Sequence, residues 1–439
     1  MSYSDLNTQQ KALQINVDRR IYGTFAEIGG GQEIARWFFR VGGASGTVAK
    51  TMSAYDMTVS DAIYGKSSRY VARDRLGAML DHEFELLVER LGDTKGKEAS
   101  LFAFADTVSA RNFQGTNECH GWMGLRFQSE PGAAPSDIVM HINMLDKENL
   151  QQQEALGVVG VNLIYGAFYD RDSIDSLIEN LVDDLGGNRI EIDILEFSGP
   201  AFKDVDNRVV GLKLLQLGLA NAIIYDPGNR LVQPSEVVRK RPLLIERGAY
   251  RALKQLNLDS VEAAKSRFAK SVAGSKEPIS LLELSMHEAA QKETVSLESM
   301  LERIDQLTAM GHRVIVSRYY EFYQVTSYLR RYTDEPIGFL MGVATLARLF
   351  NPEFYGNLEG RLLEGLGRAL SHHVKFYVYP MHLIDVHSLL AIDGPTEVCA
   401  IRDGSNLVGV DDLFYPDPLS SLYQFLLKSK FIEGIPAGH

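Results

Sequence analysis

The stretch that decides the fold is "VVGVNLIYGAFYDRDSIDSLIENLVDDLGGNRIEIDILEFSGPAFKDVDNRVVGLKLLQLGLANAIIYD", residues 158–226. Three segments of this stretch are apolar runs bounded by polar residues or by Gly and Pro, as in buried strands. They are "VVGVNLIYGAFY" (158–169), "RIEIDILEF" (189–197) and "NAIIYD" (221–226). We predict a β-strand for each of them.

The segments between these strands have the apolar period of helices. "SIDSLIENLVDDLG" (173–186) has two glycines at and after its end, and "NRVVGLKLLQLGLA" (207–220) precedes the third strand. Strands that alternate with helices are typical of βαβ units. We therefore expect the three strands to be parallel in one sheet, with right-handed crossovers and the two helices covering the sheet.

The same logic extends to the first 150 residues, where helices come before strands. The apolar positions predict helices over 8–20, 34–41 and 60–92, followed by strands over 100–108, 121–127 and 137–145. The predicted fold class is α/β, with mostly parallel sheets built from βαβ units in two or three lobes and a helical N-terminal region.

Alternation of strands and helices resumes after residue 279. Before it, "SVEAAKSRFAKSVAGSKEP" (260–278) predicts a helix and then a loose connector. The chain of 439 residues is long enough for two or three domains. The predicted divisions are an N-terminal α/β region (1–150), a βαβ unit (151–258), a helix with linker (259–279) and a C-terminal α/β lobe (280–439).

Composition excludes several classes of protein. A net charge of −12 argues against a broad surface for nucleic acid or an anionic membrane. No run of eighteen apolar residues is present, and the N-terminus does not have the pattern of a signal peptide. Two cysteines form no disulfide framework and fit a reducing compartment. We expect a cytoplasmic protein that binds neither membrane nor nucleic acid.

The glycine-rich segment "GTFAEIGGGQEIARWFFRVGGASGTVAKT" invites comparison with phosphate loops. It matches neither the P-loop nor the dinucleotide pattern, because the glycine spacing differs and no strand is evident before Gly29. A glycine-rich turn at a helix N-terminus can still bind an anion. Gly29, Gly30, Gly31 and Lys50 are therefore candidate cofactor-binding residues, with Trp37 in the helix that follows. Tight turns and close helix packing are the structural alternative.

The segment "ADTVSARNFQGTNECHGWMG" concentrates reactive side chains after a predicted strand. Asp106, Glu118, Cys119 and His120 are candidate catalytic residues, and Arg111 is a candidate anion ligand. Ligands of open α/β sheets lie beyond the carboxyl ends of strands, which favours a ligand-facing loop here. Because neighbouring side chains diverge, Cys119 and His120 do not form a dyad by adjacency. A structural turn is the alternative.

A second strand end, in "VIVSRYYEFY", carries Arg318 and Glu321. Arg318 has the fork geometry that binds phosphate or carboxylate, and Glu321 is a candidate catalytic base. An internal ion pair between these two side chains is the alternative.

Other sites are poorly supported. The sequence contains no H-E-x-x-H and no C-x-x-C, so we predict no metal site. It also contains no G-x-S-x-G, the nucleophile turn of serine hydrolases. No cofactor is assigned.

Several segments together resemble a bacterial protein family. These segments are 22–65, "NECHGWMG", "LQQQEALGVVGVNLIYGAF" and "RIEIDILEFSGPAF", and the resemblance extends to "VKFYVYP" near the C-terminus. Members of that family carry the names "TonB-dependent receptor" and "nicotinate-nucleotide adenylyltransferase". Neither name fits this chain, which has neither the signal peptide and strand pattern of a receptor nor an H-x-G-H motif after its first strand. The resemblance implies a cytoplasmic protein and transfers no catalytic residue.

Two classes of function remain open. The first is an enzyme or binding protein for a small anionic or nucleotide-like ligand, such as a phosphorylated small molecule, and α/β alternation with polar strand ends favours it. The second is a structural protein that assembles with copies of itself into oligomers or filaments. We expect a homo-oligomer in either case.

Overall fold

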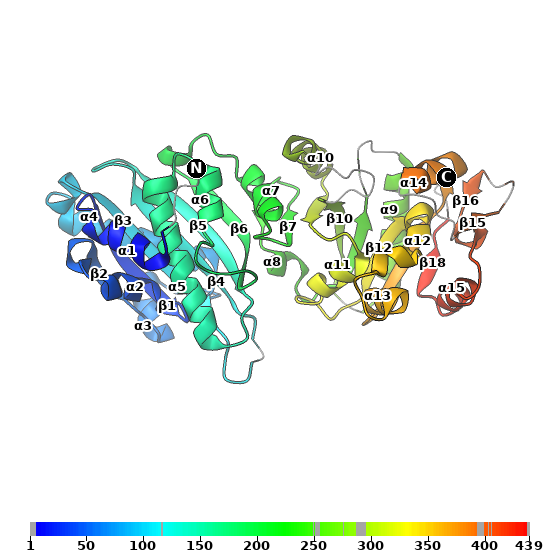
Figure 1. The fold of residues 1–439 in the computed structure, drawn as a ribbon, viewed down its shortest axis with the longest axis horizontal. Coiled ribbons are helices and arrows are strands. Elements are labelled where there is room, and N and C mark those ends of the chain that lie inside the picture. Colours follow the sequence, from blue (N-terminus) through cyan, green and yellow to red (C-terminus); the bar gives the residue numbers. More distant parts are fainter. Residues whose placement is uncertain are drawn as a thin grey trace. The chain divides into compact units, whose positions relative to one another are not determined.

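The computed structural model is an α/β protein that divides into two compact units (Figure 1). Unit 1 comprises residues 1–220 and unit 2 comprises residues 221–439. This division falls before residue 221, and the boundaries predicted from the sequence lie at 150, 258 and 279. Ser275, in the expected linker, lies outside the described residues. The structure describes residues 6–115, 117–248, 250, 255–274, 276–286, 296–392, 399–402, 404 and 406–436.

Unit 1 contains one six-stranded sheet in the order β2-β1-β3-β4-β5-β6. The first three strands in this order, β2, β1 and β3, are parallel to one another. The pairs β3–β4, β4–β5 and β5–β6 are antiparallel. The sheet is therefore mixed. Its strands are β1 (Ile21–Gly29), β2 (Val48–Met52), β3 (Ser100–Ser109), β4 (His120–Gln128), β5 (Pro135–Met144) and β6 (Ile190–Ser198).

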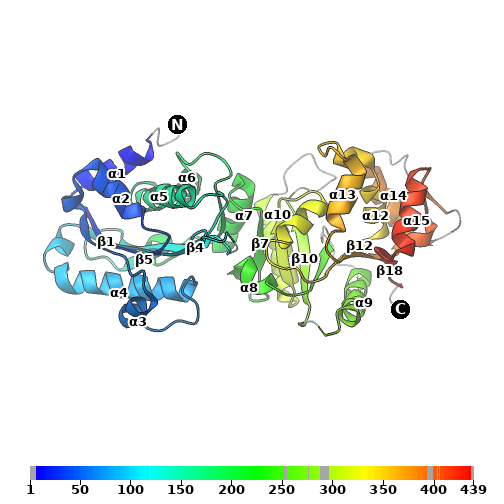
Figure 2. The same cartoon turned by 90° about the horizontal axis from the view of Figure 1, so that it is seen from below.

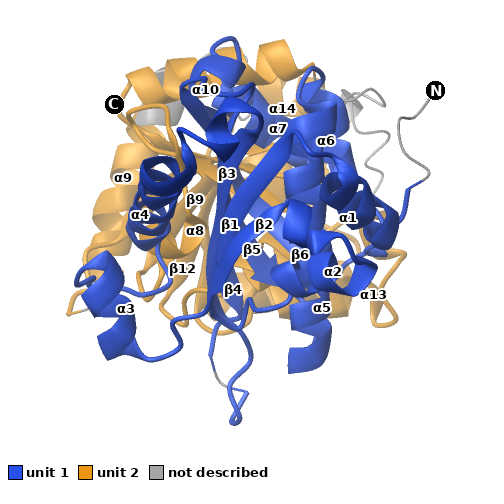
Figure 3. Ribbon diagram, turned by 90° about the vertical axis from the view of Figure 1, so that its left-hand side faces the viewer, with its two compact units in different colours: residues 1–220 blue, residues 221–439 orange. Residues whose placement is uncertain are grey.

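Helices cover both faces of this sheet, as Figures 2 and 3 show. α1, α2, α5 and α6 lie on one face, and α3 and α4 lie on the other. α7 packs against β6 at the edge of the sheet. The helices are α1 (Thr8–Val17), α2 (Ile34–Val41), α3 (Met57–Tyr64), α4 (Arg73–Leu91), α5 (Asn149–Tyr165), α6 (Ile174–Asn180) and α7 (Asn207–Leu217).

The prediction of a strand over 158–169 is wrong, because most of this segment lies in α5. From Ala155 onward every residue of α5 is buried, so the helix shows no polar face from which its period could be read. Gly157 and Gly160 allow α2 to approach closely: a Cβ on Gly160 would lie 2.3 Å from a carbon of Ile34. These glycines serve helix packing.

The expected three-stranded parallel sheet also does not form. β6 (190–198) pairs antiparallel with β5, and β7 (Ala222–Tyr225) belongs to the sheet of unit 2. Conversely, β1 directly precedes the glycine-rich turn, although no strand was evident there from the sequence. Gly23 weakened that pattern, and it is required because a Cβ would lie 2.3 Å from the ring of Phe102.

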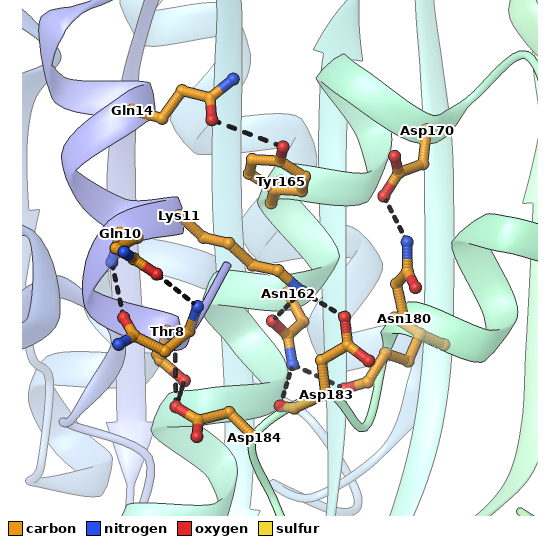
Figure 4. Close-up of polar contacts among 12 residues, drawn as sticks. Thr8, Gln10, Lys11, Gln14, Asn162, Tyr165, Asp170, Asn180, Asp183 and Asp184 are labelled. Atoms are coloured by element: carbon orange, nitrogen blue, oxygen red, sulfur yellow. Dashed lines mark hydrogen bonds and ion pairs between the residues drawn. The ribbon is translucent and has the colours of Figure 1, made fainter. Parts of the chain in front are cut away.

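A buried lysine fastens the first helix to the rest of unit 1 (Figure 4). The ammonium group of Lys11 is fully buried, 2.8 Å from a carboxylate oxygen of Asp183 and 3.0 Å from Oδ1 of Asn162. The backbone and hydroxyl of Thr8 both donate to Asp184. Because every group drawn here has a partner, the cluster serves to hold α1 in place.

Unit 2 contains an eight-stranded sheet in the order β18-β13-β12-β9-β10-β11-β7-β8. Its first six strands are parallel to one another, and β7 and β8 continue it antiparallel. The strands of this sheet after β7 are β8 (Leu231–Val232), β9 (Leu243–Arg247), β10 (Ile279–Ser285), β11 (Arg313–Ser317), β12 (Ile337–Gly342), β13 (Val374–Tyr379) and β18 (Ile432–Gly434).

A large apolar core forms on one face of this sheet, where the strands contact the five helices that follow β11. α9 contacts β9 and β12 on the opposite face (Figure 2). The helices of unit 2 are α8 (Pro234–Val238), α9 (Gln255–Ser271), α10 (Leu297–Ala309), α11 (Phe322–Leu329), α12 (Val343–Leu349), α13 (Arg361–Ala369), α14 (Leu383–Ile392) and α15 (Leu419–Lys428). The predicted α/β fold class is confirmed.

Candidate functional site: a histidine relay at the strand ends of unit 1

Several strand ends of unit 1 meet at one edge of the sheet. β1 and β3 end there, and antiparallel pairing places the start of β4 and the end of β5 beside them. Ser109 at the end of β3 pairs with His120, which in turn pairs with Asn143 of β5. Asp106 lies three residues before the end of β3. The structure thus brings Asp106 and His120 to the same edge.

A buried carboxylate–imidazole pair joins β5 to β6 at this edge. Nδ1 of His141 lies 2.5 Å from Oδ1 of Asp193, and each side chain is only 1% exposed. The amide of Asn143 donates to the other oxygen of Asp193 at 2.9 Å. The strand register shifts by one residue next to His141, which makes Asp193 the extra residue of a β-bulge. Bulges re-aim side chains, and this one turns the carboxylate toward the imidazole.

A second histidine continues the chain. Nδ1 of His120 lies 2.9 Å from Nε2 of His141. Because a carboxylate oxygen only accepts, we assign the proton of His141 to Nδ1, and its Nε2 is then an acceptor. His120 must donate from Nδ1, so its Nε2 carries the lone pair. We call this chain, Asp193–His141–His120, the relay.

The relay runs from the core to the edge of the sheet. Asp193 and His141 are buried, whereas His120 is half-buried at the first position of β4. The ring of Trp122 packs against His141 with centroids 5.0 Å apart and holds it in orientation. A carboxylate behind an imidazole fixes the tautomer and stabilises the protonated ring, which is the arrangement of a general base.

Two carboxyl groups lie on the opposite face of the same edge. Glu27 on β1 pairs in register with Asp106 on β3. Burial raises the pKa of Glu27 to about 7, although the amides of Ile34 and Ala35 donate to its carboxylate. Burial, and next the charge of Glu27, raise the pKa of Asp106 well above its usual range. Burial beneath the glycine-rich turn therefore favours the neutral form of Asp106 over its carboxylate.

That turn packs tightly on the pair. A Cβ on Gly31 would lie 2.3 Å from a carboxyl oxygen of Asp106, and Gly29 has a φ of 78°. The amide of Gly30 donates to the carbonyl of Val108. The first amides of α2, where we expected a phosphate, are bonded to Glu27 instead. These contacts fit the structural alternative of tight turns and close packing, and the anion-binding role of the glycines stays a prediction.

The loop between β3 and β4 contains the remaining candidates of this region. The backbone amide of Arg111 donates to Gln152, and the carbonyl of Glu118 accepts from Ser109. The carbonyl of Cys119 accepts from Met144, while its Sγ lies 3.8 Å from the carbonyl of Asn117. Consecutive extended residues point to opposite faces, so the sulfur of Cys119 and the ring of His120 face apart.

Lys50 lies away from this edge, in the middle of β2. Its ammonium group is 2.5 Å from the carboxylate of Glu83 on α4. The predicted grouping of Lys50 with the glycine-rich turn is therefore wrong.

Arg318 and Glu321 belong to unit 2. Glu321 precedes α11 and caps it, and burial raises its pKa to about 7 against the opposing charges of Arg247 and Arg348. The backbone amide of Arg318 donates to Asn221. No ion pair between the side chains of Arg318 and Glu321 is found among the described residues.

Among the residues that the structure describes, no group of three or more His, Cys, Asp or Glu side chains is arranged to hold a metal ion. Within the same part of the chain, no helix combines the length and apolar character needed to cross a membrane.

Glu27, His141, Asn143 and Asp193 were not among the candidate site residues predicted from the sequence. A signal was present: "DIVMHINML" places His141 and Asn143 two residues apart in an otherwise apolar strand, on one face of the sheet. Buried polar side chains in such strands need partners, which points to a polar group on a neighbouring strand. The sequence did not identify Asp193 as that group, because Asp193 lies in a β-bulge that the residue pattern does not reveal.

Comparison with known proteins gives limited information. No protein-family model and no curated protein matches this chain. Among solved structures, the competence/damage inducible protein CihA from Agrobacterium tumefaciens has a TM-score of 0.27 and 16% identity, covering 38% of this chain and 99% of that one. CinA superfamily proteins from Enterobacter cloacae and Escherichia coli have the same TM-score at 10% and 14% identity, each covering 38% of this chain and 94% of its own. Likeness at this level carries no conclusion about function.

Proposed function

We propose that unit 1 is an enzyme that performs acid–base chemistry on a small phosphorylated or nucleotide-like anion. One observation carries the proposal: the relay begins at a buried carboxylate and ends at a half-buried imidazole beside several strand ends. The second imidazole extends this chain beyond the buried pair to the strand ends, which favours proton transfer there. Strand ends are also where α/β proteins bind their ligands.

The relay supplies a defined proton path. In the proposed reaction, Nε2 of His120 removes a proton from a water molecule, and the resulting hydroxide attacks the substrate. His141 accepts a hydrogen bond from the imidazolium of His120, and the carboxylate of Asp193 stabilises the positive charge. His120 then returns the proton to the leaving group, so the enzyme is unchanged at the end of the cycle.

Cationic side chains near this edge fit an anionic substrate. Lys66 and Arg69 are exposed on the loop between α3 and α4. The next residue, Tyr70, fastens this loop to β3, because its carbonyl accepts from the hydroxyl of Thr107 at 2.6 Å. Thr107 lies two residues before the strand position that pairs with His120. Local positive charge in a chain of net charge −12 favours encounter with anions at this edge.

Incubation with a panel of nucleotides and phosphorylated small molecules, followed by NMR, tests the proposal. The parent protein should convert at least one compound. His120→Gln should slow that conversion by about 10²–10⁴-fold, the usual contribution of a general base, without changing the circular dichroism spectrum. His382→Gln, at an exposed histidine of unit 2, is the matched control. Equal turnover by His120→Gln and the parent would exclude the relay as the catalytic group.

Self-assembly is a second candidate, supported by a separate observation. Tyr55, Met57 and Val59 lie close together in sequence and are 80%, 60% and 50% exposed. Exposed apolar side chains in such a cluster favour contact with another chain. Light scattering at micromolar concentration should then detect large homomeric particles, and Met57→Glu should dissolve them; a monodisperse monomer contradicts assembly.

A further inference from the structure

A pocket in unit 1 lies between the edge strand β2 and the second half of α4. Its volume is about 140 Å³. Its lining is mostly apolar, with a few charged side chains. The residues that line it are Thr24, Ala49, Lys50, Glu83, Leu86, Leu87, Arg90 and Leu91.

A β-bulge shapes one wall of this pocket. Gly23 of β1 pairs with Val48 and Thr24 pairs with Lys50, so Ala49 is an extra residue between parallel strands. Bulges between parallel strands are rare, and they re-aim the neighbouring side chains. Here Ala49 and Lys50 both line the pocket opposite α4.

A buried carboxylate holds the lysine in position. Glu83 is fully buried and lies 2.5 Å from the ammonium group of Lys50. The hydroxyl of Tyr64 donates to the same carboxylate at 2.8 Å. Burial, and next the charge of Glu83, raise the pKa of Tyr64 above its usual range, so the phenol stays a donor. Lys50 keeps 37% of its side chain exposed and lines the pocket.

The charges of the lining do not cancel. Lys50 and Arg90 contribute two positive charges against one negative charge from Glu83, and three leucines supply apolar wall. A cavity of about 150 Å³ is large enough for benzene, so this pocket fits a ligand with about six apolar heavy atoms. We propose that it binds a small monocarboxylate with an apolar body, its carboxylate between Lys50 and Arg90.

This site is separate from the relay. Thr24 pairs with Ala103 on β3, which lies six residues before Ser109. At roughly 3.3 Å per residue, the pocket and the relay are about 20 Å apart along the strand. The proposal therefore does not depend on the proposed function of the relay.

Isothermal titration calorimetry of the full chain with benzoate, benzamide and benzylamine tests the charge requirement. These three probes have similar shape and carry a negative charge, no charge and a positive charge, respectively. Benzoate should bind at a single site at least ten-fold more tightly than benzamide, and benzylamine should not bind. Absence of benzoate binding at millimolar concentration, or equal affinity for benzamide, overturns the proposal.

Variants locate the binding. Arg90→Gln alters an exposed side chain and should weaken benzoate at least three-fold. The double variant Lys50→Met with Glu83→Leu leaves no buried charge unpaired, and benzoate should lose its ten-fold advantage over benzamide. Lys97→Gln, at an exposed lysine outside the pocket, should change nothing. Parent-like benzoate affinity in Arg90→Gln overturns the proposal even where the double variant fails to fold.

Two further measurements separate this site from others. Leu86→Trp should fill the pocket and abolish binding of benzoate and of benzamide together. His120→Gln should bind benzoate as the parent does. If His120→Gln weakens benzoate as strongly as Arg90→Gln, the carboxylate binds at the relay and the proposed pocket site is overturned.

Discussion

The two units arrange polar groups at their strand ends in different ways. In unit 2, Glu283 at the end of β10 is fully buried and accepts from both Arg247 and Ser317. Arg247 also donates to the carbonyls of Tyr319 and Tyr320, and it stacks on Phe322. In unit 1 the chain of hydrogen bonds leads outward from Asp193 to the half-buried His120.

This difference distinguishes a structural network in unit 2 from the proposed catalytic group of unit 1. In unit 2 the guanidinium and the carboxylate satisfy each other, and the network ties β9, β10 and β11 to the loop that follows. In unit 1 the relay instead ends at the half-buried imidazole of His120, which the carboxylate of Asp193 supports through His141. Both networks lie at strand ends, so their position alone does not distinguish them. We base the proposed function on the chemistry of the group that ends the relay.

The largest expected effect follows from removing the charge at the inner end of the relay. Asp193→Asn keeps the shape but donates a hydrogen from its amide, which favours the wrong tautomer of His141. Turnover should fall about 10³–10⁴-fold, as for the equivalent change in a catalytic triad. Steady-state kinetics measures this loss, with the substrate identified in the panel of nucleotides and phosphorylated small molecules. Glu283→Gln in unit 2 is the control and should change turnover less than two-fold.

The second effect concerns the free energy of unfolding. Here we expect the larger loss in unit 2 and the smaller loss in unit 1. Arg247→Met leaves Glu283 buried without its partner, which should cost about 3–5 kcal/mol of unfolding free energy. His120→Gln should cost less than about 1 kcal/mol, because the side chain is half-buried and polar in both forms. Urea unfolding followed by circular dichroism measures both values. A larger loss in His120→Gln would mean that the relay is mainly structural.

The third effect is a dependence of stability on pH. Burial raises the pKa of Glu246 on β9 to about 8, against smaller opposing effects of Tyr250 and Lys265. Because the folded-state pKa lies above the unfolded one, the neutral acid stabilises unit 2 at low pH, and this contribution is lost as pH rises from about 4.5 to 8. Glu246→Gln should therefore melt progressively higher than the parent as pH increases from 5 to 9.

Unit 1 offers the comparison for this measurement. Glu27 has a raised pKa of about 7 with the same sign, but two backbone amides donate to its ionised form. Glu27→Gln should therefore gain less with rising pH than Glu246→Gln. Equal melting curves for Glu246→Gln and the parent across this range would show that the carboxyl of Glu246 ionises freely in the folded protein.

The sequence predicted the fold class and three of the strands that form the candidate site, while the role of the site residues stays a prediction. Strand periodicity located β3, β4 and β5, and the rule of strand ends then selected Asp106 and His120. The strand predicted over 158–169 was wrong because the second half of α5 is buried on all sides. Its apolar run therefore does not show the period of a helix. β1 was missed because Gly23 and the glycines that follow lower strand propensity, although close packing requires them.

The remaining site residues depend on contacts that no local pattern encodes. His141 and Asp193 are 52 residues apart, and their contact needs a bulge that shifts register by one residue. Glu27 looked like an ordinary charged residue before a glycine run, yet it is buried and caps α2. These contacts could not be predicted from the sequence, because they join residues far apart in the chain and depend on a local irregularity of the backbone.

The smallest expected effect concerns Cys119, the neighbour of the relay in sequence. Its backbone carbonyl is bonded to Met144, and its sulfur has one weak contact, 3.8 Å from the carbonyl of Asn117. Because neighbouring residues of an extended segment point to opposite sides, we expect His120 not to activate the sulfur. Cys119→Ser should therefore change turnover less than three-fold, and treatment of the parent protein with iodoacetamide should leave turnover equally unaffected. A loss of 10³-fold or more in Cys119→Ser would instead make the thiol the nucleophile and reduce the relay to a supporting role.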